Sequence, residues 1–113
     1  MTDQAALARA ATSDDLILEE RRGAVTILTL NRPAARNALS LAMIAALHGA
    51  IDRISGDDGV SVVILGAAGP AFCAGHDLKE LTAHRKDDDR GRAFFAETMR
   101  ACAAMMQSIC LLY

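Results

Sequence analysis

The sequence predicts a small α/β domain, and three observations lead to this prediction. Two runs rich in β-branched and aliphatic residues, Val25–Leu30 and Ser61–Leu65, are typical of strands. Two longer segments, 41–54 and 95–109, carry apolar residues at the three- and four-residue spacing of amphipathic helices. Strands that alternate with helices favour a sheet with some parallel pairing. The length of 113 residues corresponds to one domain.

The chain is expected to begin with a tail and a β-hairpin. Residues 1–13 are rich in alanine and precede the first apolar run, so we expect a flexible tail there and an ordered domain over 14–113. The runs Leu16–Glu20 and Val25–Leu30 read as two strands. Arg21–Ala24 between them contains a glycine and predicts the turn of the hairpin.

The first helix is predicted from its cap and its apolar spacing. Pro33 has no N–H for a strand ladder, so it ends the second strand. Ser40 stands where a helix N-cap belongs, and Gly56 stops the helix. One side of the helix between them is apolar and is expected to face the core, through Leu41, Ile44, Leu47, Ile51 and Ile54.

The second half of the chain adds a strand and another long helix. Ser61–Leu65 is a short apolar run, from which we expect a strand buried on both faces. After a charged connection over Lys86–Arg92, the last helix is expected to bury one stripe, formed by Phe95, Met99, Cys102, Met106 and Ile109. The predicted order is ββαβα, without an internal repeat.

Composition limits the classes of partner. Hydrophobic residues make up 52% of the chain and aromatic residues only 4%. Because one small domain cannot hide so much aliphatic surface, we expect an oligomer or a part of a larger fold. The net charge of −2, with scattered basic residues, gives no footprint for nucleic acid.

Cysteine usage and the N-terminus predict the compartment. Cys73, Cys102 and Cys110 are odd in number and have no CxxC spacing, so we interpret all three as free thiols in a reducing compartment. The first residues lack the apolar core of a signal peptide, and no apolar run reaches the roughly 18–20 residues of a membrane span. We therefore expect a cytoplasmic protein without a membrane partner.

The segment Ala71–Leu81, AFCAGHDLKEL, is the most informative about function. It follows a predicted strand and reads as a glycine turn and a short polar helix. Gly75 permits a sharp turn, which would leave the backbone N–H groups of His76, Asp77 and Leu78 unpaired at a helix start. Such fixed donors stabilise the negative oxygen of an enolate or a tetrahedral intermediate. The expected contribution of His76 is its backbone rather than its ring.

Other interpretations of these residues are structural. His76, Asp77 and His84 lack the spacing of a metal site, so we expect no bound metal, and we expect His84 to be exposed to solvent. Asp77 fits a helix-start residue that accepts backbone hydrogen bonds. Cys73 has no assignable histidine base and fits a small buried thiol. We expect the pair Met105–Met106 to fill the core.

Two motifs resemble those of the enoyl-CoA hydratase/isomerase family, also called the crotonase superfamily. They are VTILTLNRPAARNALS and SVVILGAAGPAFCAGHDLKEL, and the resemblance runs from about Leu16 to Ile109. It implies the N-terminal part of a crotonase-like spiral of ββα units that assembles as trimers or hexamers. It also implies an acyl-CoA thioester as substrate, with no cofactor other than the coenzyme A of that substrate.

The resemblance also assigns roles to individual residues. The backbone N–H of His76 corresponds to one oxyanion donor, and Ala38 lies in the loop that approaches adenine. Arg36 is the candidate for the CoA phosphates, with an ordinary exposed loop arginine as the alternative. The remaining residues expected along the substrate channel are Ala74, Gly75, Asp77, Leu78 and Lys79.

In relatives the second oxyanion donor and the acid/base carboxylates come later in the chain. The last residues, Cys110–Tyr113, depart from the family pattern, so we expect a truncated chain. Loss of one oxyanion donor costs about 100- to 1000-fold in rate and loss of the acid/base roughly another 100- to 10,000-fold, so the chain alone should be nearly inactive. The parent activity implied is 2-enoyl-CoA hydratase or isomerase. A non-catalytic CoA-binding or interaction module is the alternative, and an unstable remnant is a third possibility.

Overall fold

The computed structural model describes residues 15–112, so the tail predicted for residues 1–13 lies outside the described part. The predicted order of strands and long helices is confirmed, and the short polar helix is present as α3. The elements are β1 (Ile17–Arg22), β2 (Val25–Leu30), η1 (Pro33–Ala35), α2 (Leu41–Ser55), β3 (Val62–Ala67), α3 (Leu78–Ala83), η2 (His84–Lys86) and α4 (Arg92–Cys110).

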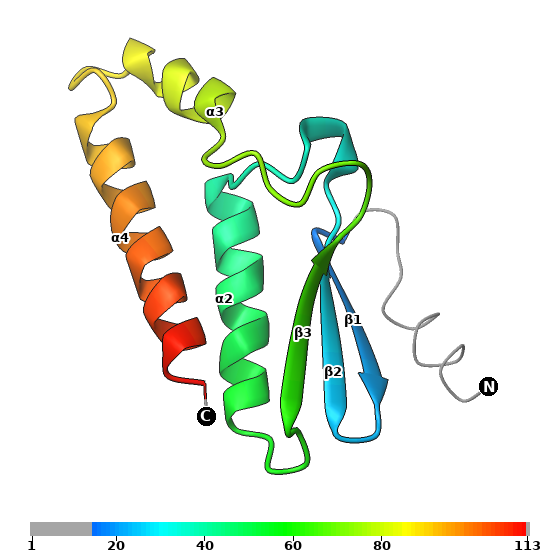
Figure 1. The fold of residues 1–113 in the computed structure, drawn as a ribbon. Coiled ribbons are helices and arrows are strands. Elements are labelled where there is room, and N and C mark those ends of the chain that lie inside the picture. Colours follow the sequence, from blue (N-terminus) through cyan, green and yellow to red (C-terminus); the bar gives the residue numbers. More distant parts are fainter. Residues whose placement is uncertain (1–14, 113) are drawn as a thin grey trace.

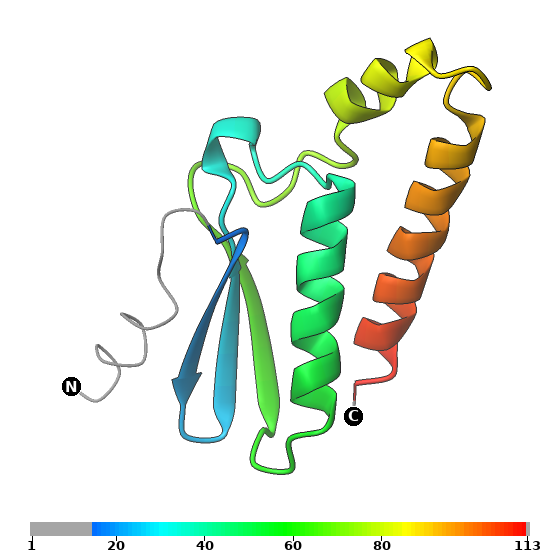
Figure 2. The ribbon, with the colours of Figure 1, turned by 180° about the vertical axis from the view of Figure 1, so that it is seen from behind.

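The three strands form one mixed sheet in the order β1-β2-β3. β1 and β2 pair antiparallel, and β2 and β3 pair parallel. Helix α2 connects the parallel strands and lies between the sheet and α4 in both views (Figures 1 and 2). The described chain therefore has three layers, with both long helices on the same side of the sheet.

The hairpin turn is shorter than the sequence predicts. Arg21 and Arg22 continue the first strand and pair with Thr26 and Val25. Gly23 has a φ of +61°, a backbone conformation that glycine adopts without steric strain. This lets a two-residue turn reverse the chain, so the strand runs two residues further than expected.

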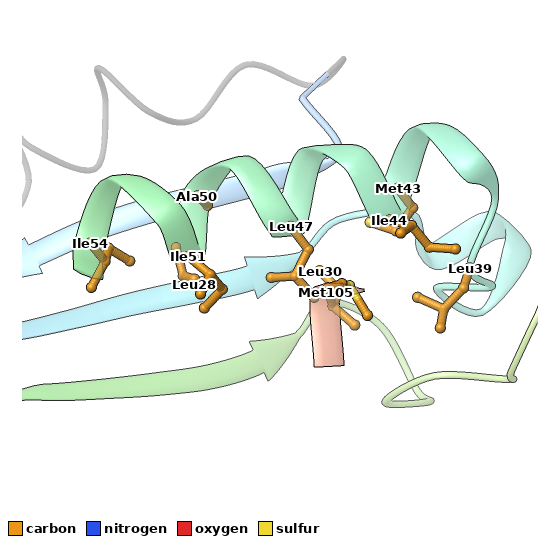
Figure 3. Packing of buried hydrophobic residues seen from close by; sticks show 10 residues of the cluster. All are labelled: Leu28, Leu30, Leu39, Met43, Ile44, Leu47, Ala50, Ile51, Ile54 and Met105. Atoms are coloured by element: carbon orange, nitrogen blue, oxygen red, sulfur yellow. The ribbon is translucent and has the colours of Figure 1, made fainter. Parts of the chain in front are cut away.

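Helix α2 begins and ends as predicted. The Ser40 hydroxyl accepts a hydrogen bond from the Met43 N–H at 3.1 Å, and Gly56 is the C-cap. Along the predicted stripe, the residues after Leu41 are buried, whereas Leu41 itself is half-buried. Figure 3 shows the buried side chains of α2 against Leu28 and Leu30 of β2, with Met105 of α4 among them. The core cluster consists of Leu28, Leu30, Leu39, Met43, Ile44, Leu47, Ala50, Ile51, Ile54 and Met105.

The expectation that β3 is buried on both faces is wrong. Val62 and Ile64 are each 49% exposed, whereas Val63 and Leu65 pack against the core cluster. A parallel strand is buried on both faces only where both are covered. Within residues 15–112 the helices cover one face, which leaves the other side chains open to solvent.

The predicted stripe on the last helix is also partly wrong. Thr98 and Met105 are the buried residues of α4, whereas Phe95 and Met106 are 53% and 50% exposed. Only Met105 of the expected methionine pair therefore fills the core. Neighbouring residues on a helix point in directions about 100° apart. A small error in the predicted orientation of α4 about its axis therefore exchanges which of two neighbouring residues is buried and which is exposed.

Two isoleucines provide a test of the open face. Ile44 is 1% exposed in α2 and Ile64 is 49% exposed in β3. We expect Ile44→Ala to lower the free energy of unfolding by about 2–5 kcal/mol, because it removes buried methylene groups and leaves a cavity. Ile64→Ala is expected to cost about 1 kcal/mol or less. Urea unfolding of both variants measures this, and equal losses would contradict an open face on β3.

Candidate functional site

Parallel pairing of β2 and β3 brings the loops after these strands to the same edge of the sheet. The two loops are joined by backbone hydrogen bonds. The N–H of Leu39 donates to the carbonyl of Gly75 at 2.7 Å, and the N–H of Asp77 donates to the carbonyl of Leu39 at 2.9 Å. The N–H of Ala74 donates to the carbonyl of Arg36 at 3.0 Å. The loops therefore behave as one unit beyond the end of the sheet.

This pairing leaves the backbone N–H of His76 available. Leu39 forms an isolated parallel bridge with His76, and in such a bridge it bonds the residues on either side. The N–H of His76 donates to no group within residues 15–112. The expectation of a free N–H thus holds for His76 and is wrong for Asp77, whose N–H is taken by the Leu39 carbonyl.

Gly75 gives the turn its shape, as the sequence predicts. Its φ is +98°, in the region that side chains with a Cβ rarely adopt. An added Cβ would meet nothing within 4 Å, so the requirement for glycine there is conformational rather than one of space. The turn sets the direction of the following N–H, which belongs to His76.

The Asp77 carboxylate ties the two loops together through side chains. It accepts from Arg32 Nη1 at 2.8 Å and from the backbone N–H of Glu80 at 3.1 Å. These two donors hold the pKa of Asp77 below its usual value of 3.8. Glu80 Oε1 in turn accepts from the N–H of Leu41 at 2.8 Å, in the first turn of α2. The prediction that Asp77 is a helix-start residue is confirmed, and its carboxylate is already occupied.

Asn37 is a buried residue that the sequence analysis does not single out. Its side chain is fully buried and its φ is +56°. Asn37 Oδ1 accepts from the N–H of Arg32 at 2.7 Å, and Nδ2 donates to the carbonyls of Ala68 and Ala71 at 2.9 Å each. The Asn37 amide therefore makes one hydrogen bond within the loop after β2 and two to the loop after β3.

The other predicted site residues lie on the rim of these loops. Arg36 is exposed, with backbone hydrogen bonds only, and Ala38 is buried. The Ala38 carbonyl accepts from Arg32 Nη1 at 3.2 Å, and its N–H donates to the Ala35 carbonyl at 3.1 Å. On the rim after β3, Ala74, Gly75, Leu78 and Lys79 are exposed.

The alternative chemistries find no support within the described residues. No group of three or more His, Cys, Asp or Glu side chains is placed to hold a metal among residues 15–112. The three cysteines are free thiols, as predicted. His84 is not fully exposed as expected, because its ring stacks on Phe94 with centroids 3.6 Å apart. No helix within this part of the chain is long and apolar enough to cross a membrane.

The family comparison covers most of the chain. The family model described as enoyl-CoA hydratase/isomerase matches residues 25–109. The chain belongs to the enoyl-CoA hydratase/isomerase family. The match includes both loops of the candidate site and the helices that follow them.

Individual relatives carry several activities in their names. Human enoyl-CoA hydratase domain-containing protein 3, mitochondrial, is 40% identical over 82 residues, which are 73% of this chain and 25% of that protein. Rat 3-hydroxyisobutyryl-CoA hydrolase, mitochondrial, is 45% identical over 71 residues, 62% of this chain and 18% of that protein. The chain thus spans about a quarter or less of the length of these two relatives.

A solved structure shows the same fold. The enoyl-CoA hydratase of Mycobacterium smegmatis matches with a TM-score of 0.78 and 42% identity. The match covers 88% of this chain and 37% of that one. The described residues therefore form the N-terminal portion of a crotonase-like α/β fold, as the two sequence motifs indicate.

The ion pair of Asp77 gives the site a pH-dependent contribution to stability. Because the folded-state pKa of Asp77 is lowered, its contribution is present above about pH 4 and is lost as the pH falls through the folded-state pKa. At neutral pH we expect Asp77→Asn to lower the free energy of unfolding by about 1–2 kcal/mol. Urea unfolding should show this difference shrinking below about pH 4.

An exposed ion pair is the matched control for this prediction. Arg21 Nη1 lies 2.8 Å from Asp57 Oδ2, and the two side chains are 41% and 43% exposed. Water and salt screen such a pair, so Asp57→Asn should have a smaller effect than Asp77→Asn. An effect of Asp77→Asn that does not change between pH 7 and pH 3 would contradict the role of its charge.

Proposed function

We propose that these residues form the thioester-binding part of an acyl-CoA site, in which the backbone N–H of His76 donates to the carbonyl oxygen of the substrate. The observation that carries the proposal is a donor without an acceptor in residues 15–112, held between two hydrogen bonds to Leu39. A donor fixed in this way needs no reorganisation when negative charge develops on the oxygen.

The proposed parent reaction is the hydration or isomerisation of a 2-enoyl-CoA. In hydration, water adds across the α,β double bond and the electrons move onto the thioester oxygen as an enolate. The His76 N–H would stabilise that oxygen while a proton is delivered to the α carbon. A second donor and the acid/base carboxylates are expected in parts of the family fold that these 113 residues do not cover. The described residues alone should therefore bind the thioester and turn it over very slowly.

The coenzyme end of the substrate is proposed to lie along the loop after β2. Arg36 is exposed, and no carboxylate pairs with its guanidinium within residues 15–112. A guanidinium in this position suits bidentate contact with phosphate. Ala38 lies two residues further on, in the stretch of this loop proposed to approach adenine. Its carbonyl accepts from Arg32 Nη1 at 3.2 Å and from the N–H of Ser40 at 3.1 Å, which hold the backbone of this stretch in place.

A non-catalytic interaction module remains the second candidate. The observation that favours it is the set of large apolar side chains left exposed, among them Val62, Ile64, Phe72 and Met106. Such surface is typical of faces that pack on another polypeptide. Sedimentation of the purified chain tests this second candidate. A defined oligomer would support self-association, and a monodisperse monomer would count against it.

Binding of trans-2-butenoyl-CoA tests the donor. We expect Gly75→Ala to weaken binding about fivefold, because the strained turn no longer directs the His76 N–H at the carbonyl. His76→Ala keeps the backbone N–H and should retain the infrared shift of a ¹³C-labelled thioester carbonyl to lower frequency. Gly75→Ala should lose that shift.

Gly23→Ala is the matched control for the strain. Gly23 also has a positive φ of +61° and nothing within 4 Å of an added Cβ, but it lies in the hairpin turn. The Gly23→Ala variant should lower stability as Gly75→Ala does and leave the dissociation constant for trans-2-butenoyl-CoA unchanged. A carbonyl frequency in wild-type protein equal to that in water would refute the proposed role of His76.

Arg36→Gln tests the phosphate contact. We expect this variant to weaken binding of free coenzyme A about fivefold, which corresponds to one exposed charge pair, and to weaken it less at high salt. Arg100→Gln, an exposed arginine of α4, is the control and should have no effect. Equal affinities for Arg36→Gln and wild type would leave Arg36 as an ordinary loop arginine.

A further inference from the structure

A hollow of about 440 Å³ lies between α3 and the start of α4. Two kinds of side chain line it. The apolar ones include Leu78, Leu81 and Phe95, and the charged ones are Arg85, Arg90 and Arg92. An apolar wall combined with several guanidinium groups suits a ligand that has both a hydrocarbon part and a negative charge.

The charge of this hollow is of one sign. Three arginines line it and no carboxylate does, and none of these arginines forms an ion pair with a carboxylate within residues 15–112. Two of the three aspartates that precede Arg90 are used elsewhere in the turn. Asp87 Oδ2 lies 2.8 Å from His84 Nδ1, and the Asp89 carboxylate accepts from the N–H groups of Gly91 and Ala93. The three guanidinium groups therefore have no ion-pair partner among residues 15–112.

The turn that presents the arginines is built to a fixed shape. Gly91 is buried with a φ of +86°, and a Cβ there would lie 2.9 Å from the carbonyl oxygen of His84. The His84 ring stacks on Phe94, and Asp89 caps α4. These contacts hold the backbone of Arg90 and Arg92, so the points from which the two side chains extend are set by packing within the turn.

The hollow is connected to the candidate oxyanion donor through the chain itself. Leu78, which lines the hollow, is the second residue after His76. Among the residues that line the hollow, Leu78 is therefore the nearest in sequence to the proposed carbonyl-binding position. We propose that the hollow receives the far end of the acyl chain and that the preferred substrates are acyl-CoA thioesters whose acyl chain ends in a carboxylate. This inference rests on the proposed function.

Matched ligand pairs test the inference on the 113-residue chain. We would titrate trans-2-hexenedioyl-CoA against trans-2-hexenoyl-CoA, and trans-2-decenedioyl-CoA against trans-2-decenoyl-CoA. In at least one pair the dicarboxylic ligand should bind about tenfold more tightly, as expected for charge-assisted hydrogen bonds to guanidinium. The preference should fall as salt increases.

The variant Arg90→Gln/Arg92→Gln should remove the preference and leave the affinity for the neutral ligands unchanged. Arg100→Gln, outside the hollow, should keep the preference. Free coenzyme A separates the two possible sources of the anion, since an equal loss of coenzyme A affinity in the double variant would assign the arginines to its phosphates and overturn the inference.

The outcomes separate this inference from the proposed function. Neutral enoyl-CoA ligands that bind without any preference for the dicarboxylic partner, at both chain lengths, would overturn the carboxylate inference and leave the thioester site intact. No binding of any of the four thioesters would overturn the thioester site itself, and the inference with it.

Discussion

The candidate site depends on the side-chain amide of Asn37. This buried group makes three hydrogen bonds, one within its own loop and two to the carbonyls that follow β3. A neutral amide that both donates and accepts satisfies backbone groups of opposite polarity, which an apolar side chain of similar size would leave unpaired. Parallel strand pairing brings the two loops to one edge, and Asn37 fixes their separation. The bridge between Leu39 and His76 can then form at a defined register.

The local features of the site are those that the sequence predicts. The Ser40 cap and the turn at Gly75 each follow from one residue and its immediate neighbours. The partners of Arg32 and Asn37 in the loop after β3 lie 31 to 45 positions away, and no spacing rule connects them. The one available signal is acidic residues at positions 77 and 80, the pattern of a helix N-terminus, which indicates the cap but not its ion pair with Arg32.

The errors in the predicted fold concern which faces are covered. Periodicity identifies the apolar side of an element, but it does not say whether a second layer lies on that side. Ile64 and Phe95 are large apolar residues in regular elements, and both are about half exposed because α2 packs on other faces of β3 and α4. The apolar surplus in the composition indicated exposed surface of this kind, but it did not indicate where on the molecule that surface lies.

A site whose donor is a backbone amide has a consequence for how such proteins diverge. The peptide group at position 76 is present whichever amino acid the codon specifies, so mutations there alter the walls of the site without deleting the donor. Position 75 has no such latitude, because its backbone conformation with φ at +98° suits glycine. With the His76 N–H as the proposed donor, substitutions at position 76 would change the shape of the site and keep the donated hydrogen bond. A comparison of catalytic side chains alone would then miss that two such proteins share this donor.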